Sequence, residues 1–517
     1  MKSDSRLNYS LKLIVKTSMI VLIGIIISKI ALYAYRVIIA RHFGPEVYGL
    51  FSIALMILNL FVAISTLGLN EGLLRYISIS RGENNNKKIV YLFKNLKKIS
   101  FISSILVAVL LFLFSDIISN SVFHNSALSI YLKISAIIIP FYVLSSFYLA
   151  AIRAFEMVGW YSFIINILQN VVKLAALALM IFFGFKSQNI MYSFFIGIFI
   201  MFLAAYWLCK YKIDWLFQEL SKKKFKSGLL KEVMYYSLPL MFSSVFGIIY
   251  YWIDSFALGY LKNATAVGFY NAIIPIALLI SIVPDLFIQM FYPLITKEYS
   301  KKNFKIIKEL SKQVSKWSFI LALPLFLIIL IFPGAVINIL FGPNYLIAEN
   351  ALRVLSIGSF ISLLSGLLFT LLSMAGKSKT IFLTLIISSA INLTLNLFLI
   401  PRYGINGAAI ATTIVWIGLT VFLFSKVYSI LSFVPLRRKM IRILLVSLIP
   451  TGLLIYVKSF FTINLLTLAL LGIFFIFLYL LIMFLTNCLD RNDIMIIKSF
   501  KHKLLGIKTA PIEDKSL

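Results

Sequence analysis

The sequence is short of charge, and most of the charge it has is of one sign. Only 13% of its 517 residues are charged, and 49 Lys and Arg residues stand against 18 Asp and Glu, for a formal net charge of +31. Soluble domains contain about 25% charged residues, which excludes a soluble enzyme with one added anchor. Two cysteines and three histidines offer neither a disulfide framework nor a Cys/His metal site, so no metal and no cofactor is predicted.

Apolar residues make up 61% of the chain and recur in long runs from end to end. A bilayer-spanning helix needs about 20 mostly apolar residues. Fourteen runs meet this length, from 18–40 and 48–69 at the start to 441–458 and 464–486 at the end. Because period-two alternation is lacking, the runs are predicted as helices and not as strands of a transmembrane barrel. The predicted fold class is an all-α integral membrane protein with about 14 transmembrane helices.

The basic residues alternate between the predicted connections. If residues 1–17 are cytoplasmic, the segments on that side hold 39 of the 49 Lys and Arg residues, and the seven connections on the other side hold one each. Lys and Arg gather on the cytoplasmic side of membrane proteins. We therefore predict a multi-pass protein of the cell (cytoplasmic) membrane with both termini cytoplasmic. Most of the net charge then reflects topology, and no nucleic acid is predicted as a partner.

The connections are too short for several kinds of active site. The longest external one, 114–129, has about 16 residues, which leaves no room for the paired acids of a membrane glycosyltransferase. The cytoplasmic connections contain no Gly-rich phosphate loop, which excludes an ATP-driven pump in one chain. The chain is predicted not to be an enzyme.

A parallel internal repeat divides the chain into two halves. Gly49 opens a predicted span behind a short external turn, and Gly268 does the same 219 residues later. Two lobes of six helices each are the plan of a transporter whose substrate binds at the lobe interface. The predicted parts are a cytoplasmic N-terminus (1–17), an N-lobe (18–211), a cytoplasmic linker (212–232), a C-lobe (233–430), two extra helices (441–486) and a basic cytoplasmic tail (487–517).

Three basic residues lie inside predicted spans, where charges are costly and are usually functional or paired. Lys29 and Arg36 are seven residues apart on the first span, so they share one helix face. We predict that they face a central cavity and bind an anion, the alternative being that they snorkel to an interface. Lys173 lies on the fifth span and favours a cavity there.

Polar stripes accompany these charges. Asn166 and Asn170 share a face with Lys173, and Asn392 and Asn396 follow each other at i+4 on the eleventh span. Such stripes either line the cavity and bind sugar hydroxyls or join neighbouring membrane helices, and the two interpretations are equally weighted.

Two acidic residues also lie inside predicted spans. The repeat offset takes Arg36 to Ser255, next to Asp254. Three interpretations stay open for Asp254: a salt bridge to the first lobe that breaks during transport, a coupling proton or sodium ion, or static pairing within its own lobe. Asp285 follows Pro284, where a kink is expected, and is a weaker candidate for the same gating or coupling role.

Two further basic residues lie near the inner ends of the second and fourth spans. Arg75 and Arg153 are predicted to contact a phosphate group at the cytoplasmic mouth of the cavity. The alternative is that they only anchor the chain by the positive-inside rule.

Four segments carry a resemblance to a known family. They run from Ser28 to Gly49, from Gly68 to Tyr76, from Asp254 to Tyr270 and from Pro401 to Ala409. In this order and at these helix positions they resemble polysaccharide-biosynthesis flippases, the polysaccharide-transporter branch of the multidrug/oligosaccharidyl-lipid/polysaccharide exporter superfamily. The resemblance extends over nearly the whole chain.

The resemblance implies that a polyprenyl-diphosphate-linked oligosaccharide moves from the cytoplasmic to the outer leaflet by alternating access. Related flippases of peptidoglycan precursors carry two basic residues on the first helix; the first corresponds to Lys29, and the second lies next to Arg36. A diphosphate carries about two negative charges and needs fixed cations in a low-dielectric cavity. The implied partners are the lipid-linked glycan, the bilayer, H+ or Na+ as coupling ion, and glycan polymerases or glycosyltransferases.

Other functions are weighed against this one. A cation-coupled multidrug exporter of the same fold should carry carboxylates in its first-lobe cavity, whereas Lys29 and Arg36 would repel a cationic drug. A membrane glycosyltransferase or ligase needs the large external loop that is lacking here. A non-transporting assembly partner of glycan enzymes is distinguished only by a transport assay.

Overall fold

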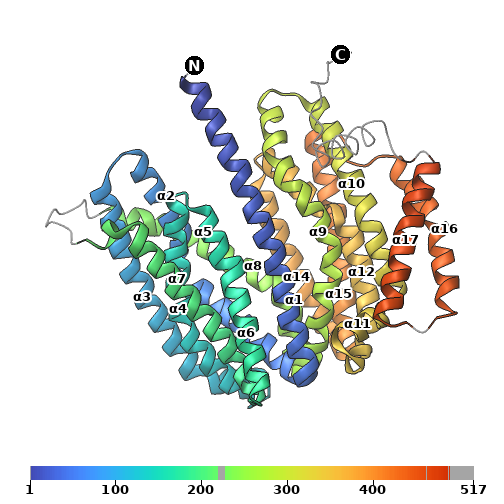
Figure 1. The fold of residues 1–517 in the computed structure, drawn as a ribbon, viewed down its shortest axis with the longest axis horizontal. Helices are drawn as coiled ribbons and strands as arrows, with labels where there is room; N and C mark the ends of the chain where they lie inside the picture. The colour runs from blue at the N-terminus through green and yellow to red at the C-terminus, as the bar shows by residue number, and fades with distance from the viewer. Residues whose placement is uncertain (1, 219–227, 462, 487, 489–517) are drawn as a thin grey trace. The chain divides into compact units, whose positions relative to one another are not determined.

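The computed structural model describes residues 2–218, 228–461, 463–486 and 488. For residues 2–23, 25, 26, 285, 286, 289 and 290 it describes the backbone only. The described residues form helices and connecting turns, and they contain no strand. The α-helices, shown in Figure 1, are α1 (Lys2–Ser65), α2 (Leu69–Gly82), α3 (Asn86–Ile117), α4 (Leu128–Ala154), α5 (Val158–Ser162), α6 (Gln169–Phe182), α7 (Ile190–Lys212), α8 (Leu229–Leu261), α9 (Ala264–Ser300), α10 (Phe304–Ile331), α11 (Pro333–Phe341), α12 (Glu349–Ile361), α13 (Ser365–Met374), α14 (Ser378–Tyr403), α15 (Ile405–Leu431), α16 (Lys439–Lys458) and α17 (Leu465–Leu485).

Short turns of other helix types join several of these elements. Two are π-helices, η1 (Ile118–Val122) at the end of α3 and η2 (Phe163–Leu168) between α5 and α6. Four are 3₁₀ turns: η3 (Ser187–Asn189), η4 (Asp214–Phe217), η5 (Pro343–Ala348) and η6 (Ser362–Leu364). A single π turn inside a longer helix often marks a functional position.

The first two predicted spans lie on one long element, α1, which is broken at Gly44. Gly44 has φ 82° and ψ 176°, far from helical values, and Pro45 follows it. Glycine adopts this conformation without a steric penalty, and proline suits the first turn of the helix that resumes. By length and hydropathy, 13 of the described helical segments are candidate membrane spans. The all-helical membrane fold is confirmed, whereas the number fourteen is not.

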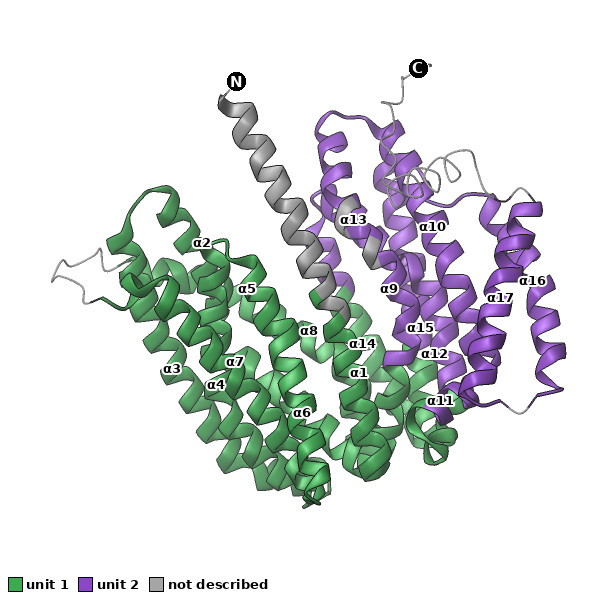
Figure 2. Cartoon of the chain, in the orientation of Figure 1, with its two compact units in different colours: residues 1–274, 340–351, 385–412 green, residues 275–339, 352–384, 413–517 purple. Residues whose placement is uncertain are grey.

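The chain divides into two compact units, each built from several segments (Figure 2). Unit 1 comprises residues 1–274, 340–351 and 385–412, and unit 2 comprises residues 275–339, 352–384 and 413–517. The six-helix lobes at 18–211 and 233–430 stay a prediction.

Unit 2 has an apolar core to which the last two helices attach. Buried Phe291, Leu367 and Leu423 belong to this core. Tyr479 of α17 donates a hydrogen bond to the Ile320 carbonyl of α10 over 3.1 Å, and Lys458 at the end of α16 donates to the Ile331 carbonyl over 2.9 Å. Both extra helices are therefore tied to α10.

Unit 1 contains a very close approach of two helices. A Cβ atom built on Gly49 of α1 would lie 1.7 Å from the Ala264 carbonyl oxygen, and one built on Gly268 of α9 would lie 1.9 Å from the Pro45 carbonyl oxygen. Only glycine leaves space for such backbone contact. The two glycines that mark the predicted repeat therefore meet within one unit.

Candidate functional site

Arg36 of α1 is the centre of a cluster of tyrosines in unit 1. Its guanidinium hydrogen-bonds with the hydroxyls of Tyr251 on α8 and Tyr48 on α1. The Tyr48 hydroxyl also donates to the Asn271 carbonyl of α9 over 3.2 Å. Arg36 is half-buried, and its neighbours fix its position without neutralising its charge.

Lys173 of α6 lies near Arg36 and is almost completely buried, with 4% of its surface exposed. Its ammonium lies 5.4 Å from the centre of the Tyr35 ring and 5.6 Å from that of Phe194. Cations are attracted to the faces of aromatic rings at such distances. Lys173 is also close enough to Arg36 for the two positive charges to interact.

A glycine on α7 and hydrogen bonds of the neighbouring asparagines set the position of Lys173. A Cβ atom at Gly197 of α7 would lie 2.8 Å from the Lys173 Cβ, so glycine admits the lysine against α7. Asn170 donates to Ser28 of α1 over 2.9 Å and to the Asn166 carbonyl over 2.8 Å. These bonds place the predicted Asn pair beside α1 and next to Lys29, whose own side chain is exposed.

In this basic cluster (Lys29, Arg36 and Lys173), the described residues give neither Arg36 nor Lys173 an acidic counterpart. No Asp or Glu of the described residues acts on the Arg36 guanidinium or the Lys173 ammonium; each is influenced only by tyrosines or by the other cation. Buried charges in proteins are normally paired. Two neighbouring cations held by neutral groups are therefore suited to bind an anion.

Asp254 of α8 is the centre of a second cluster, in which every partner among the described residues is neutral. Tyr270 of α9 and Thr412 of α15 donate to Oδ2 over 2.8 and 2.5 Å, and Asn396 of α14 donates to Oδ1 over 2.7 Å. Asn396 also donates to Asn392 Oδ1 over 2.5 Å. Four helices thus meet at one buried carboxylate.

The Asp254 cluster is rich in oxygen atoms, and one of them accepts no hydrogen bond from the described residues. The Nδ2 atom of Asn396 serves both Asp254 and Asn392. Its Oδ1 atom is buried without a hydrogen-bond partner among the described residues. Buried polar atoms are rarely left unpaired, and oxygen ligands are those that hard cations prefer. The arrangement is suited to a proton or a small cation.

The two clusters are joined through α8, where Tyr251 and Asp254 lie on consecutive turns. Among the described residues, Asp254 makes no ion pair with Arg36; its carboxylate is occupied by Tyr270, Thr412 and Asn396. Asn392 and Asn396 take part in helix-to-helix bonds here, and their predicted contact with sugar stays a prediction.

The remaining predicted residues lie apart from both clusters. Arg153 is 3.4 Å from Glu71 in an ion pair. Arg75 lies over the Tyr236 ring at 4.4 Å, and a hydrogen bond to Tyr236 raises the pKa of the Arg75 guanidinium above its ordinary value. Both arginines are at least partly accessible. The side chain of Asp285 lies outside the described residues.

Sequence reasoning missed the neutral partners of both clusters. Tyr48, Tyr251, Tyr270 and Thr412 contact the charged residues directly. Tyr270 closes a motif that the sequence singles out, and Thr412 lies one turn after the segment that ends at Ala409. Tyr48 also lies inside such a segment, whereas Tyr251 lies one turn before Asp254, and no sequence signal distinguishes Tyr251 or Thr412 from other residues of these helices.

Comparison with known proteins connects this geometry to a family. A putative O-antigen transporter of Shigella flexneri is 27% identical over 394 residues, which cover 73% of this chain and 88% of that protein. A probable low-salt glycan biosynthesis flippase of Haloferax volcanii, Agl15, is 25% identical over 314 residues, 60% of this chain and 64% of that protein. These relatives are named as a transporter and a flippase and not as catalysts.

The fold is shared with a solved structure. The lipid II flippase MurJ in its inward closed conformation superimposes with a TM-score of 0.68 and 18% identity, covering 90% of this chain and 98% of MurJ. The profile described as MatE matches residues 239–398, and the profile described as polysaccharide biosynthesis protein matches residues 14–299. Since this last match spans more than half of the sequence, the chain is a multi-pass membrane protein that belongs to the polysaccharide biosynthesis protein family, in the polysaccharide-transporter branch of its superfamily.

Proposed function

We propose that the chain is a flippase that moves a polyprenyl-diphosphate-linked oligosaccharide from the cytoplasmic to the outer leaflet by alternating access. The observation that carries the proposal is the basic cluster, in which Arg36 and Lys173 share a site and have no acidic partner among the residues that the structure describes. A diphosphate brings about two negative charges, and an interaction in a low-dielectric site is far stronger than in water. Lys29, exposed on the same helix, provides a third cation.

The polar surroundings of the basic cluster support a glycan cargo. Asn166 and Asn170 lie beside α1 within the same unit, and amides both donate and accept hydrogen bonds, as sugar hydroxyls require. The polyprenyl tail can stay in the bilayer while the polar part crosses. Arg75 and Arg153 are accessible cations that would receive the diphosphate at the cytoplasmic mouth.

We also propose that the Asp254 cluster binds the coupling ion, H+ or Na+. Within the described residues, its buried carboxylate accepts hydrogen bonds from neutral side chains. The side-chain oxygen of Asn396, which has no hydrogen-bond partner there, offers a further ligand. An ion bound there would alter the bonds that hold α8, α9, α14 and α15 together. This links ion binding to a change in helix packing.

The direction of transport rests on the charge pattern. We propose that both termini are cytoplasmic, because 39 of the 49 basic residues then lie on the cytoplasmic side. Glycan polymerases or glycosyltransferases would act on either side of the membrane as partners.

A multidrug exporter is the second candidate, supported by the MatE match over residues 239–398. It would have to hold organic cations next to Arg36 and Lys173, which repel them. A flippase needs the basic cluster to bind a diphosphate, whereas a drug exporter needs a site that does not repel organic cations.

The test is a flipping assay in proteoliposomes. A polyprenyl-diphosphate oligosaccharide is placed in the membrane, and an impermeant glycan-modifying reagent reports its leaflet for wild type, Arg36→Ala and Lys29→Ala. We expect wild type to flip the lipid and Arg36→Ala to lose at least tenfold in rate, with a smaller loss for the exposed Lys29. The matched control is Lys186→Ala, an exposed lysine outside both clusters, which should flip normally. Extrusion of a cationic dye without glycan flipping would replace the flippase by the drug exporter.

A further inference from the structure

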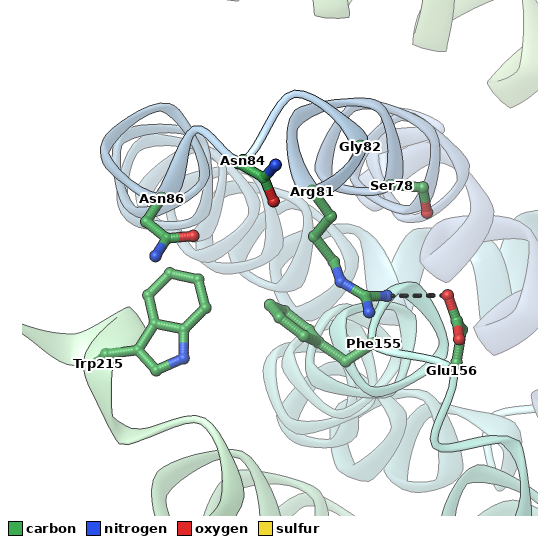
Figure 3. A pocket seen from close by; sticks show the side chains of 8 residues that line it. All are labelled: Ser78, Arg81, Gly82, Asn84, Asn86, Phe155, Glu156 and Trp215. Atoms are coloured by element: carbon green, nitrogen blue, oxygen red, sulfur yellow. Dashed lines mark hydrogen bonds and ion pairs between the residues drawn. The ribbon is translucent and has the colours of Figure 1, made fainter.

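A pocket of about 560 Å³ lies in unit 1, away from both clusters (Figure 3). Its wall comes from four places: the end of α2 with Arg81, the start of α3 with Asn86, the turn after α4 with Phe155 and Glu156, and the turn η4 with Trp215. None of these residues takes part in the basic cluster or the Asp254 cluster. The pocket is therefore a separate site.

The charges of the described lining residues cancel. Arg81 forms an ion pair with Glu156 over 3.3 Å, drawn as a dashed line in Figure 3, and among the described residues these two are the charged members of the lining. Arg81 also donates to the Ala154 carbonyl over 2.5 Å and lies over the Phe155 ring at 4.9 Å. A phosphate entering the pocket would meet the Glu156 carboxylate, so the lining favours a ligand without charge.

The pocket offers both hydrogen-bonding groups and apolar ring faces. The side-chain amides of Asn84 and Asn86 and the indole N–H of Trp215 make no hydrogen bond within the described part of the chain, and each borders the pocket. An amide both donates and accepts, and an aromatic ring presents an apolar face with a polar edge. A sugar ring needs this combination, because its hydroxyls are polar while its C–H face is apolar.

The pocket is built on two turns with unusual backbone conformations. Asn84 has φ 53° and Glu156 has φ 63°, both in the left-handed region. Asparagine tolerates this region, whereas for glutamate it is uncommon. The two turns set Asn84 and Glu156 on the pocket wall, and Glu156 in this conformation reaches Arg81.

We propose that this pocket binds a sugar residue of the glycan cargo on the cytoplasmic side, before translocation; the proposal rests on the proposed flippase function. The connections that form it, within 75–98, 153–160 and 210–231, are those that the charge pattern assigns to the cytoplasm. The diphosphate belongs to the basic cluster inside the spans, and the pocket holds the uncharged end of the molecule.

The experiment measures flipping and binding separately, with lipid-linked glycan extracted from the cells that naturally make the protein. Flipping rates at increasing substrate concentration are compared for wild type, Trp215→Ala and Asn86→Ala, with Trp160→Ala as the matched control. Trp160 is a half-exposed tryptophan of α5 that does not line the pocket. We expect Trp215→Ala to raise the half-saturating concentration about tenfold with the maximal rate unchanged, and Asn86→Ala to raise it less.

Binding is measured with the glycan released from its lipid by mild acid, through quenching of tryptophan fluorescence. We expect the glycan to quench the fluorescence of wild type. Trp215→Ala should lose this quenching, and inorganic pyrophosphate should not reverse it.

The outcomes distinguish the pocket from the flippase function. If Trp215→Ala and Trp160→Ala behave alike in both assays, or if pyrophosphate displaces the glycan, the sugar pocket is refuted. If the released glycan is bound through Trp215 but the lipid-linked glycan is not flipped, the pocket stands and the flippase function fails. If the lipid-linked form depends on Trp215 while the released glycan does not bind, the pocket recognises another part of the lipid-linked molecule and the proposal is overturned.

Discussion

At the scale of single residues, Lys173 combines deep burial with the lack of an acidic partner within the described part of the chain. Its ammonium is held by the Tyr35 and Phe194 rings beside another cation, Arg36. Such a position costs stability when no anion is bound. We therefore attribute the basic cluster to the binding of an anion and not to a contribution to the free energy of folding.

The first prediction follows from this cost. Lys173→Met keeps the length of the side chain and removes the charge, so we expect the free energy of unfolding of the substrate-free protein to rise by about 1 kcal/mol or more. Flipping should fall at least tenfold. Thermal unfolding in detergent and the proteoliposome assay measure the two effects, with Lys186→Met as control. A loss of both stability and transport would show that Lys173 is a structural residue.

The second prediction concerns Asp254, whose partners are mostly hydroxyls. Asp254→Asn keeps the shape of the side chain, and the hydroxyls of Tyr270 and Thr412 can accept as well as donate. We expect the protein to fold with a loss of no more than about 2 kcal/mol, while flipping becomes insensitive to Na+ or pH gradients.

Gradient dependence is measured in proteoliposomes loaded with different Na+ concentrations or pH. The matched control is Asp116→Asn, an exposed aspartate whose carboxylate pairs with Lys133 at 2.9 Å; it should keep the response of wild type. An unchanged response in Asp254→Asn would remove the ion-coupling proposal for this residue.

Only part of the candidate site could be predicted from the sequence. Arg36, Lys173 and Asp254 are conspicuous because each is a charge inside an apolar run. Tyr251 and Thr412 are ordinary residues in such helices, and their importance depends on which helices become neighbours. That information is tertiary, so neither periodicity nor composition contains it.

At the scale of helices, the sequence predicted most elements because apolar runs of the right length have few alternatives in a membrane. The exceptions are local. The π-helix η2 (Phe163–Leu168) interrupts the 100° spacing on which the face shared by Asn166, Asn170 and Lys173 was argued. The break at Gly44, predicted as a short turn between two spans, is a single non-helical glycine followed by Pro45, so the turn is tighter than a loop and the two helices follow each other directly.

The third prediction tests the close approach of α1 and α9 at Gly49 and Gly268. A methyl group on either glycine would overlap a backbone carbonyl, at 1.7 and 1.9 Å. Backbone atoms cannot yield as a flexible side chain can, so we expect Gly49→Ala and Gly268→Ala each to lower the free energy of unfolding by about 1–3 kcal/mol. Because the two sites touch, the double variant should lose less than the sum.

Thermal unfolding of the single and double variants measures these effects. Gly159→Ala is the control, since a Cβ atom there meets nothing within 4 Å. Additive losses would mean that the two glycines act independently and that their contact does not hold α1 against α9.

At the scale of the whole molecule, the orientation in the membrane decides both the direction of transport and the side on which the sugar pocket lies. The charge pattern predicts that Lys305 is cytoplasmic and Lys186 external. Both native cysteines, Cys209 and Cys488, are buried, so an impermeant maleimide should give little background in the wild-type protein. Cysteine labelling is therefore a clean test of topology.

The last prediction uses two single substitutions at exposed positions, Lys186→Cys and Lys305→Cys. In intact cells we expect the impermeant maleimide to label Lys186→Cys and to leave Lys305→Cys unlabelled until the membrane is permeabilised. Wild type should stay unlabelled in both conditions. The opposite pattern would place the turns that form the sugar pocket outside the cell, where the pocket would meet glycan only after translocation, and the direction of flipping would have to be reversed. The labelling result therefore tests the positive-inside argument, the direction of transport and the role of the pocket with one pair of variants.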